Sequence, residues 1–249
     1  GEQYEAIFAP DRATFRRRDG TIELHTEIAV SPEDDVELRR VSVTNLGREA
    51  RHVELTSYAE VVLAPQGADV IHPGFGNLFV ETESVPDRDA LICHRRPRGD
   101  EPSRYLVHVV ASRGLVSGGA GFESDRLRFV GRLNDLRRPD ALKPAAKLSN
   151  TTGATLDPIV SLRHRVRIPP CVTARVSFIT GYAESHDAAL ALVEKYSDRH
   201  AVTRGLALAG SHSQVEMRHL NLTAEEVNEI ARLASRLRFA DRRLRSIED

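Results

Sequence analysis

The chain has 249 residues and nearly equal numbers of basic and acidic side chains, 35 against 36, which gives a formal net charge of −1 at pH 7. This length suits one large β domain or two ordinary domains. Because the net charge is so small, the composition excludes a general electrostatic attraction to nucleic acid or to anionic lipid. No stretch approaches the ~20 consecutive apolar residues that span a bilayer.

Three runs of alternating apolar and polar residues occupy residues 20–63 and predict an antiparallel meander. The first run is Ile22–Val30. In the second, the apolar positions move from one parity to the other near Arg39 and Arg40, which predicts a β-bulge. Asn45-Leu46-Gly47 then predicts a turn before the third run, at 53–61.

Further strand-like runs follow with no helical pattern between them. They are 78–82, 90–96, 105–112, 126–130, 159–168 and 173–180. So many strands in succession argue against an α/β fold and predict a large antiparallel sandwich. Gly118-Gly119-Ala120-Gly121 is interpreted as a mobile turn, because neither the Lys-Ser/Thr pair nor the helix of a phosphate-binding loop follows it.

Helical patterns occur only near the C-terminal end. Ser185 and Asp198 are placed to cap helices at 186–196 and from 199 to about 220. A third helix, from 224 to about 238, begins with a capping box formed by Thr223 and Glu226. The apolar stripe of this helix consists of Val227, Ile230, Ala231, Ala234 and Leu237. Two partners for the stripe remain open, the strands of the same chain and a separate surface.

Motifs that carry chemistry on their own are absent from the sequence. Cys93 and Cys171 belong to no CxxC or CxxxH pair, so buried free thiols are favoured over a single disulfide, and no metal site is predicted. There is no HExxH, GxSxG or Gly-rich phosphate loop. The spacing of the carboxylates does not nominate an acid–base pair. The sequence therefore predicts no catalytic residue.

One segment has a composition suited to sugar binding. In residues 72–77 a proline and two glycines shape a loop, Phe75 offers an aromatic face, and His72 and Asn77 supply hydrogen-bonding groups. The alternative is a structural loop with a core Phe and a locally bonded Asn. Arg95 and Arg96 are candidates for contact with sugar or phosphate, although pairing with a cross-strand carboxylate is the favoured interpretation. The candidate carbohydrate-binding residues are His72, Phe75, Asn77, Arg95 and Arg96.

A resemblance to a known family rests on phrases spread along nearly the whole chain. They are 15–20 (FRRRDG), 25–37 (HTEIAVSPEDDVE), 43–45 (VTN), 54–61 (ELTSYAEV), 72–75 (HPGF), 77–80 (NLFV), 156–159 (LDPI), 162–163 (LR), 180–181 (TG) and 212–216 (HSQVE). With these phrases the chain resembles the amino-terminal β-domain of the family-94 glycoside phosphorylases, formerly placed among the family-36 glycosyltransferases. Within that family it is most similar to the phosphorylase-like region of cyclic β-1,2-glucan synthases.

The resemblance implies a mainly β fold, a large antiparallel β-supersandwich of the galactose-mutarotase type. It implies that residues 1–182 form this sandwich and that residues 183–249 are a helical linker toward an (α/α)₆ barrel. Family members cleave or exchange β-glucosidic bonds with inversion, and their general acid belongs to the barrel. No organic cofactor is implied, and inorganic phosphate is the co-substrate of the parent enzyme. The implied location is the cytoplasmic side, in a parent protein held at the inner membrane.

Three functional hypotheses follow. The first is a non-catalytic domain that supports the barrel and lends a loop to its β-glucan oligosaccharide site. Under this hypothesis the formation of a homodimer remains open. The second is an autonomous carbohydrate-binding module, which is disfavoured because the chain has no Trp and only 5% aromatic residues. The third is a mutarotase-like enzyme, which needs a His and a carboxylate that converge in a cleft. No nucleic-acid partner is expected under any of them.

Overall fold

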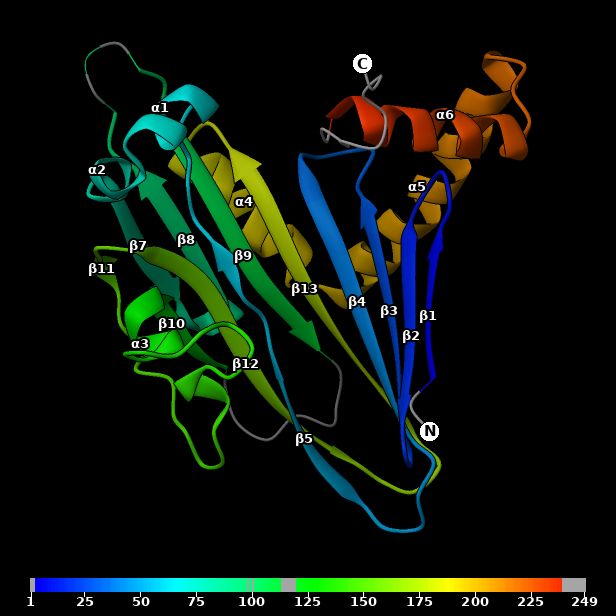
Figure 1. Cartoon of the computed structure of the whole chain (residues 1–249), viewed down its shortest axis with the longest axis horizontal. Helices are drawn as coiled ribbons and strands as arrows, with labels where there is room; N and C mark the ends of the chain where they lie inside the picture. Colours follow the sequence, from blue (N-terminus) through cyan, green and yellow to red (C-terminus); the bar gives the residue numbers. More distant parts are fainter. Residues whose placement is uncertain (1–2, 98, 100, 113–119, 239–249) are drawn as a thin grey trace, which may run out of the picture.

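Two antiparallel sheets and a group of C-terminal helices make up the computed structural model, which describes residues 3–97, 99, 101–112 and 120–238 (Figure 1). Within these residues the larger sheet has nine strands in the order β1-β2-β3-β4-β13-β9-β8-β7-β11. Its strands are β1 (Gln3–Phe8), β2 (Ala13–Asp19), β3 (Ile22–Val30), β4 (Val36–Asn45), β7 (Val80–Val85), β8 (Ala90–Arg95), β9 (Arg104–Ser112), β11 (Gly153–Ala154) and β13 (Thr173–Ala183). The prediction of a mainly β antiparallel sandwich with C-terminal helices is confirmed.

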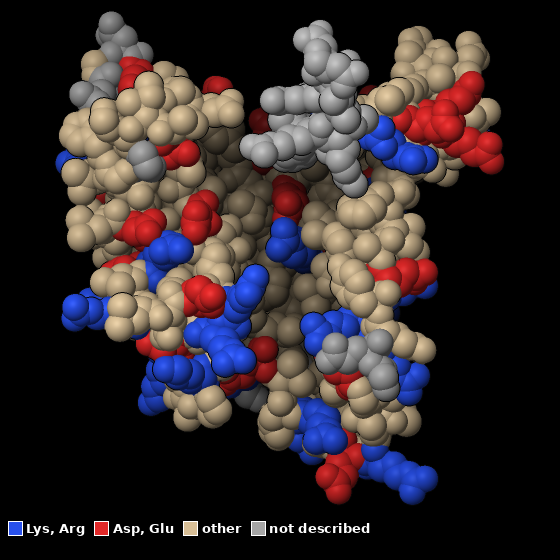
Figure 2. Space-filling view, viewed as in Figure 1, with Lys and Arg blue, Asp and Glu red and all other residues tan. Residues whose placement is uncertain are grey.

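The smaller sheet has the order β10-β12-β5, and β6 also pairs with β12. Its strands are β5 (Arg51–Thr56), β6 (Ala59–Glu60), β10 (Gly121–Asp125) and β12 (Pro158–Ile168). It packs on one face of the larger sheet through a core that includes Val43, Leu91, Val160 and Val176. Strands β1 to β3 extend beyond it, and a groove between the two sides of the molecule runs down the face shown in Figure 2.

The opposite face of the larger sheet is covered by α4 (His186–Tyr196) and α5 (Arg199–His219). Both begin as predicted, because Ser185 accepts a hydrogen bond from the Ala188 amide and Asp198 accepts one from the His200 amide. Helix α5 lies so close to β4 that a Cβ atom added at Gly205 would be 2.5 Å from a methyl group of Leu38. The division into residues 1–182 and 183–249 stays a prediction, although α4 and α5 share a core with the sheet.

The predicted bulge near Arg39 and Arg40 is wrong, because β4 pairs with β3 and β13 in unbroken register. Leu38 points into the core under the helices, whereas Val43 points into the core between the sheets. The apolar parity changes along β4 because the strand is covered on both faces at different points of its length. A regular strand with two covered faces produces the same pattern as a bulge.

Other elements also differ from the sequence predictions. Residues 126–130, predicted as a strand, form the short helix α3 (Arg126–Val130), because the Asp125 side chain accepts a hydrogen bond from the Leu127 amide and caps a helical turn. The predicted meander is wrong in its third run, since β5 pairs with β12 of the smaller sheet and not with β4. Strands β1, β2 and β10 were not predicted. Of the predicted mobile turn, Gly118 and Gly119 lie outside the described residues, and Gly121 begins β10.

Helix α6 (Ala224–Arg238) begins with the predicted capping box. The Thr223 amide donates to the Glu226 carboxylate at 2.8 Å, and the Glu226 amide donates to the Thr223 hydroxyl at 3.3 Å. The stripe of this helix does not pack into either core: Ile230 is 50% exposed and the neighbouring Leu233 is 62% exposed. The side chain of Leu237 lies outside the described residues. The described part of the stripe is therefore not buried against the strands of the same chain.

The two cysteines are both free. Cys93 is buried between the sheets, as predicted, and its sulfur lies 3.3 Å from the Thr82 hydroxyl. Burial raises the pKa of this thiol to about 12. Cys171 is exposed, which contradicts its interpretation as a buried thiol. It occupies the tight turn between β12 and β13, where its φ angle is +57°.

Candidate functional site

The predicted sugar-binding segment forms a small helical corner and not an open loop. It consists of α1 (Gln66–Ile71) and α2 (Pro73–Asn77), joined at His72. Proline has no backbone N–H, and at the first position of a helix this N–H would have no partner within the helix. Its fixed φ angle also suits the first turn. Figure 1 shows this corner at the same end of the molecule as α6.

Arg95 anchors the corner from beneath. It comes from the end of β8, is only 5% exposed, and donates from Nη1 to the carbonyl of Gly76 at 2.9 Å. Its guanidinium carbon lies 5.6 Å from the centre of the Phe79 ring, and its Nε atom lies 3.9 Å from a carboxylate oxygen of Glu101. The Arg95 side chain therefore holds α2 in place, and little of it is left exposed for a ligand.

Arg96 lies next to Arg95 but on the surface. Its Nε atom pairs with the Glu81 carboxylate of the adjacent strand at 3.2 Å. This is the cross-strand pairing that the sequence favoured for an Arg within a sheet. Phe75 is 51% exposed and meets the edge of the Phe79 ring, with the ring centres 5.3 Å apart. The structure thus brings all five candidate residues to one corner, and their contact with sugar stays a prediction.

The corner also carries an apolar surface. Val70 and Ile71 of α1, Phe75 of α2 and the adjacent Leu78 are all exposed. Large exposed apolar side chains that lie together mark surfaces that another molecule or domain covers. We call these four residues the corner patch.

A polar network lies at the edge of the smaller sheet. The Tyr58 hydroxyl donates a hydrogen bond to the Glu60 carboxylate at 2.9 Å. Arg126 donates to both, and its Nη1 atom is 3.6 Å from an oxygen of Asp157. Burial and the hydrogen bond to Glu60 raise the pKa of Tyr58 to about 12. Arg126 was missed because its segment was predicted as a strand, although the preceding Asp125 is a typical N-cap.

The mutarotase-like hypothesis needs a His and a carboxylate in one cleft, and His108 and Glu37 do line one small hollow of about 180 Å³. His108 is 3% exposed, and its two ring nitrogens lie 2.7 Å from the Ser57 hydroxyl and 3.0 Å from the Thr180 hydroxyl. Glu37 accepts a hydrogen bond from Arg39 at 2.9 Å. Both groups are already paired, and the hollow is smaller than the ~300–1,000 Å³ of typical ligand sites. It offers no free acid–base pair.

Among the described residues, no group of three or more His, Cys, Asp or Glu side chains could hold a metal ion. In the same part of the chain, no helix is both long enough and apolar enough to cross a membrane.

Residues 1–199 match the protein family described as "Glycosyl hydrolase 94, supersandwich domain". The chain is also 36% identical, over 247 residues, to the cyclic beta-(1,2)-glucan synthase NdvB of Rhizobium meliloti (strain 1021). The match covers 99% of this chain but only 9% of that relative.

Three solved structures show a distant likeness to the chain, each with a TM-score below 0.5. A bacterial glucoamylase complexed with acarbose aligns with 84% of this chain and 28% of its own, at 8% identity and a TM-score of 0.49. A protein described as "Putative kojibiose phosphorylase from human microbiome" aligns with 80% of this chain and 23% of its own, at 9% identity and a TM-score of 0.45. A galactose mutarotase related enzyme from Lactobacillus acidophilus aligns with 74% of this chain and 72% of its own, at 11% identity and a TM-score of 0.36.

Proposed function

The chain belongs to the glycosyl hydrolase 94 supersandwich family, and from this premise we propose that it is the non-catalytic N-terminal sandwich domain of a glucan-processing glycosyltransferase or glycoside phosphorylase. It supports a downstream (α/α)₆ catalytic barrel and lends the α1–α2 corner to the sugar site of that barrel. The glucan synthase relative is a much longer protein, of which the chain matches 9%. This proportion leaves room for a separate catalytic domain.

The observation that carries the proposal is a pair of uncovered apolar surfaces at one end of the molecule. The corner patch lies on one side of this end and α6 on the other (Figure 1). Exposed apolar area forgoes roughly 25 cal/mol for each Å² that it could bury. A barrel seated on this end would cover both surfaces at once, and the α1–α2 corner would then lie at its rim.

Chemistry supports a non-catalytic role for the described residues. The buried His108 and the Glu37 carboxylate that lines the same hollow are engaged in internal pairs. Glycosidic bond cleavage needs a carboxylic acid placed to protonate the leaving oxygen, and removal of a general acid typically costs factors of ~10²–10⁴. We therefore assign that acid to the barrel, with inorganic phosphate as co-substrate. A parent protein at the inner membrane with this domain on its cytoplasmic side completes the proposal.

The proposal is tested by incubating the purified 249-residue chain with β-1,2-glucan oligosaccharides and inorganic phosphate, and measuring glucose 1-phosphate and new reducing ends. No product is expected. Product whose release disappears when Glu37 or Glu60 is replaced by Gln would overturn the non-catalytic assignment.

A second measurement separates the support role from an autonomous carbohydrate-binding module. The same chain is titrated with β-1,2-glucan oligosaccharide in the absence of any barrel. We expect no saturable binding, because the half-exposed ring of Phe75 is a small platform for a sugar ring. Saturable binding that is lost in Phe75→Ala would favour the module instead.

A further inference from the structure

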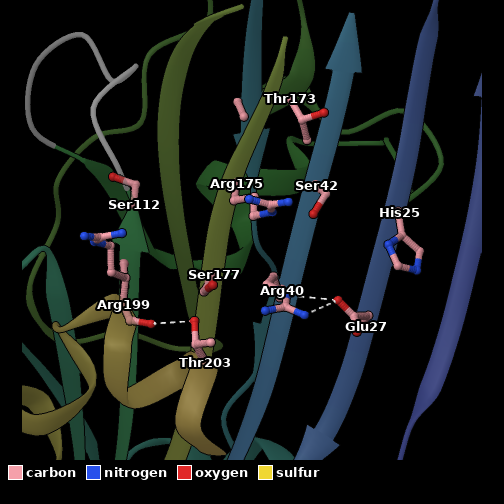
Figure 3. Close-up of a pocket in the computed structure, with 12 residues that line it drawn as sticks. His25, Glu27, Arg40, Ser42, Ser112, Thr173, Arg175, Ser177, Arg199 and Thr203 are labelled. Carbon is pink, nitrogen blue, oxygen red and sulfur yellow. Dashed lines mark hydrogen bonds and ion pairs between the residues drawn. The ribbon is translucent and has the colours of Figure 1, made fainter. Parts of the chain in front are cut away.

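A second hollow, unrelated to the α1–α2 corner, lies on the helix-covered face of the larger sheet, beside the first turn of α5 (Figure 3). Its volume of about 720 Å³ is within the ~300–1,000 Å³ range of small-molecule sites. The residues that line it include Glu27, Arg40, Arg175, Arg199 and His25.

Strand register explains why polar residues gather here. His25 on β3, Ser42 on β4 and Arg175 on β13 are direct cross-strand neighbours. Two residues further along, Glu27, Arg40 and Ser177 form the next cross-strand row. These rows continue the face that α4 and α5 cover elsewhere with apolar contacts. The sheet thus changes from an apolar to a polar lining on this face.

Only part of the charge in the hollow is neutralised by the protein. Glu27 accepts hydrogen bonds from Arg40 at 2.6 and 2.9 Å and from Arg12 at 2.9 Å. Although burial alone would raise the pKa of Glu27, these hydrogen bonds lower it, so the carboxylate stays ionised. Within the described part of the chain, Arg175 and Arg199 make no side-chain ion pair or hydrogen bond. Three guanidinium groups against one carboxylate leave an excess of two positive charges.

Two serine hydroxyls also line the hollow. Neither the Ser42 nor the Ser177 hydroxyl is hydrogen-bonded to another described residue, so both are open to water or to a ligand in the hollow. In Figure 3 the Arg175 guanidinium extends toward Ser42, and that of Arg199 extends toward Ser112.

We propose that this hollow binds a small phosphate monoester with a hydroxyl-rich body, of the hexose phosphate class. Guanidinium groups pair with phosphate oxygens through parallel N–H donors, which suits the unneutralised Arg175 and Arg199. The serine hydroxyls can donate to and accept from the hydroxyls of a sugar. The volume exceeds that needed for a bare phosphate ion. Among the described residues that line the hollow there is no Phe, Tyr or Trp, so they offer no stacking surface of the kind that a nucleobase would use.

The proposal is tested by calorimetric titration of the 249-residue chain with glucose 6-phosphate, inorganic phosphate, glucose and AMP, each at the same ionic strength. Glucose 6-phosphate is expected to bind most tightly. Arg175→Gln and Arg199→Gln should each weaken its binding about tenfold, as expected for loss of a charge-assisted hydrogen bond. Melting curves verify that both variants fold.

The matched control is Arg167→Gln. Arg167 is exposed on β12 of the smaller sheet and does not line the hollow. Its replacement by Gln therefore removes the same charge at a different place. It should leave the affinity for glucose 6-phosphate unchanged, and an equal loss in this control would show general charge attraction and overturn the proposal. Inorganic phosphate lacks the sugar hydroxyls, glucose lacks the phosphate group, and AMP carries a nucleobase for which the lining has no stacking surface. Binding of any of these three as tight as that of glucose 6-phosphate would also overturn the proposal.

Discussion

The Nε2 atom of His108 in the larger sheet lies 2.7 Å from the Oγ atom of Ser57, which follows β5 in the smaller sheet. This contact joins the two sheets through polar side chains, of which His108 is buried. The other ring nitrogen is 3.0 Å from the Thr180 hydroxyl, and the ring is nearly parallel to that of Phe178. Burial, with a smaller contribution from the charge of Arg39, lowers the pKa of His108 from 6.5 to about 4. The folded protein therefore keeps this ring neutral at neutral pH.

The first prediction concerns acid stability. Between pH 6.5 and about 4 the unfolded chain binds a proton on His108 that the folded chain does not, so the free energy of unfolding should fall as the pH is lowered through this window. The shift corresponds to roughly 3 kcal/mol over the whole window. Urea unfolding at several pH values measures this slope, and His108→Asn should flatten it.

His52→Asn is the matched control for this experiment. His52 is exposed on β5, so its loss should leave the pH slope of the parent chain intact. If His108→Asn and the unsubstituted chain show the same slope, burial of a neutral His108 does not contribute to acid sensitivity.

The second prediction concerns the close approach of α5 to the sheet. Ala usually stabilises a helix relative to Gly by roughly 0.5–1 kcal/mol. At Gly205, however, the added Cβ would be 2.5 Å from a Leu38 methyl, so Gly205→Ala should destabilise the protein by about 1–3 kcal/mol. Gly67→Ala in α1, where nothing lies within 4 Å of the added atom, should be neutral or stabilising. Thermal unfolding compares the two, and a stabilised Gly205→Ala would show that α5 does not sit this close to β4.

The sequence predicts the antiparallel sandwich and the helix caps well, because alternation and capping depend on residues close in the chain. Asp198 and the Thr223–Glu226 box are examples. Sequence patterns mislead where tertiary contacts decide. The parity change around Leu38 reflects which layer covers β4, and only the assembled fold contains that information. The hollow around Arg175 was not predicted for the same reason, since His25, Ser42 and Arg175 meet only through strand order.

At the α1–α2 corner, residue types suggested sugar contact but could not show which side chains are used internally. Arg95 and Arg96 are adjacent in sequence, yet one is buried under α2 and the other is on the surface. Alternation along a strand explains their opposite faces. It does not reveal that the buried guanidinium would hold the Gly76 carbonyl.

The third prediction tests that role. Arg95→Met should keep apolar volume but leave the Gly76 carbonyl without its donor, at a cost of about 1–3 kcal/mol. We expect faster amide exchange in residues 66–78 than in the unsubstituted chain. Arg96→Met removes an exposed pair with Glu81 and should cost less than about 1 kcal/mol, with no change in exchange there. Equal exchange in the two variants would contradict the anchoring role of Arg95.

The last prediction concerns the apolar side of α6. Ile230 and Leu233 are half or more exposed, so Ile230→Asp with Leu233→Asp should change the melting temperature of the 249-residue chain little, as is usual for surface substitutions. In a longer chain that includes the downstream barrel, the same pair should be strongly destabilising. Full burial of one such side chain is worth about 1.5–3 kcal/mol, and a buried unpaired carboxylate adds to the loss. Thermal unfolding of both chain lengths measures the difference. Asn228→Asp, which adds a charge to α6 outside the stripe, is the control and should be neutral in both. Equal destabilisation of the short and long chains by the double substitution would show that the barrel does not cover the stripe.

Sedimentation of the 249-residue chain tests whether the stripe mediates a homodimer. An association that the double substitution abolishes would assign the stripe to contact with a second copy of the chain.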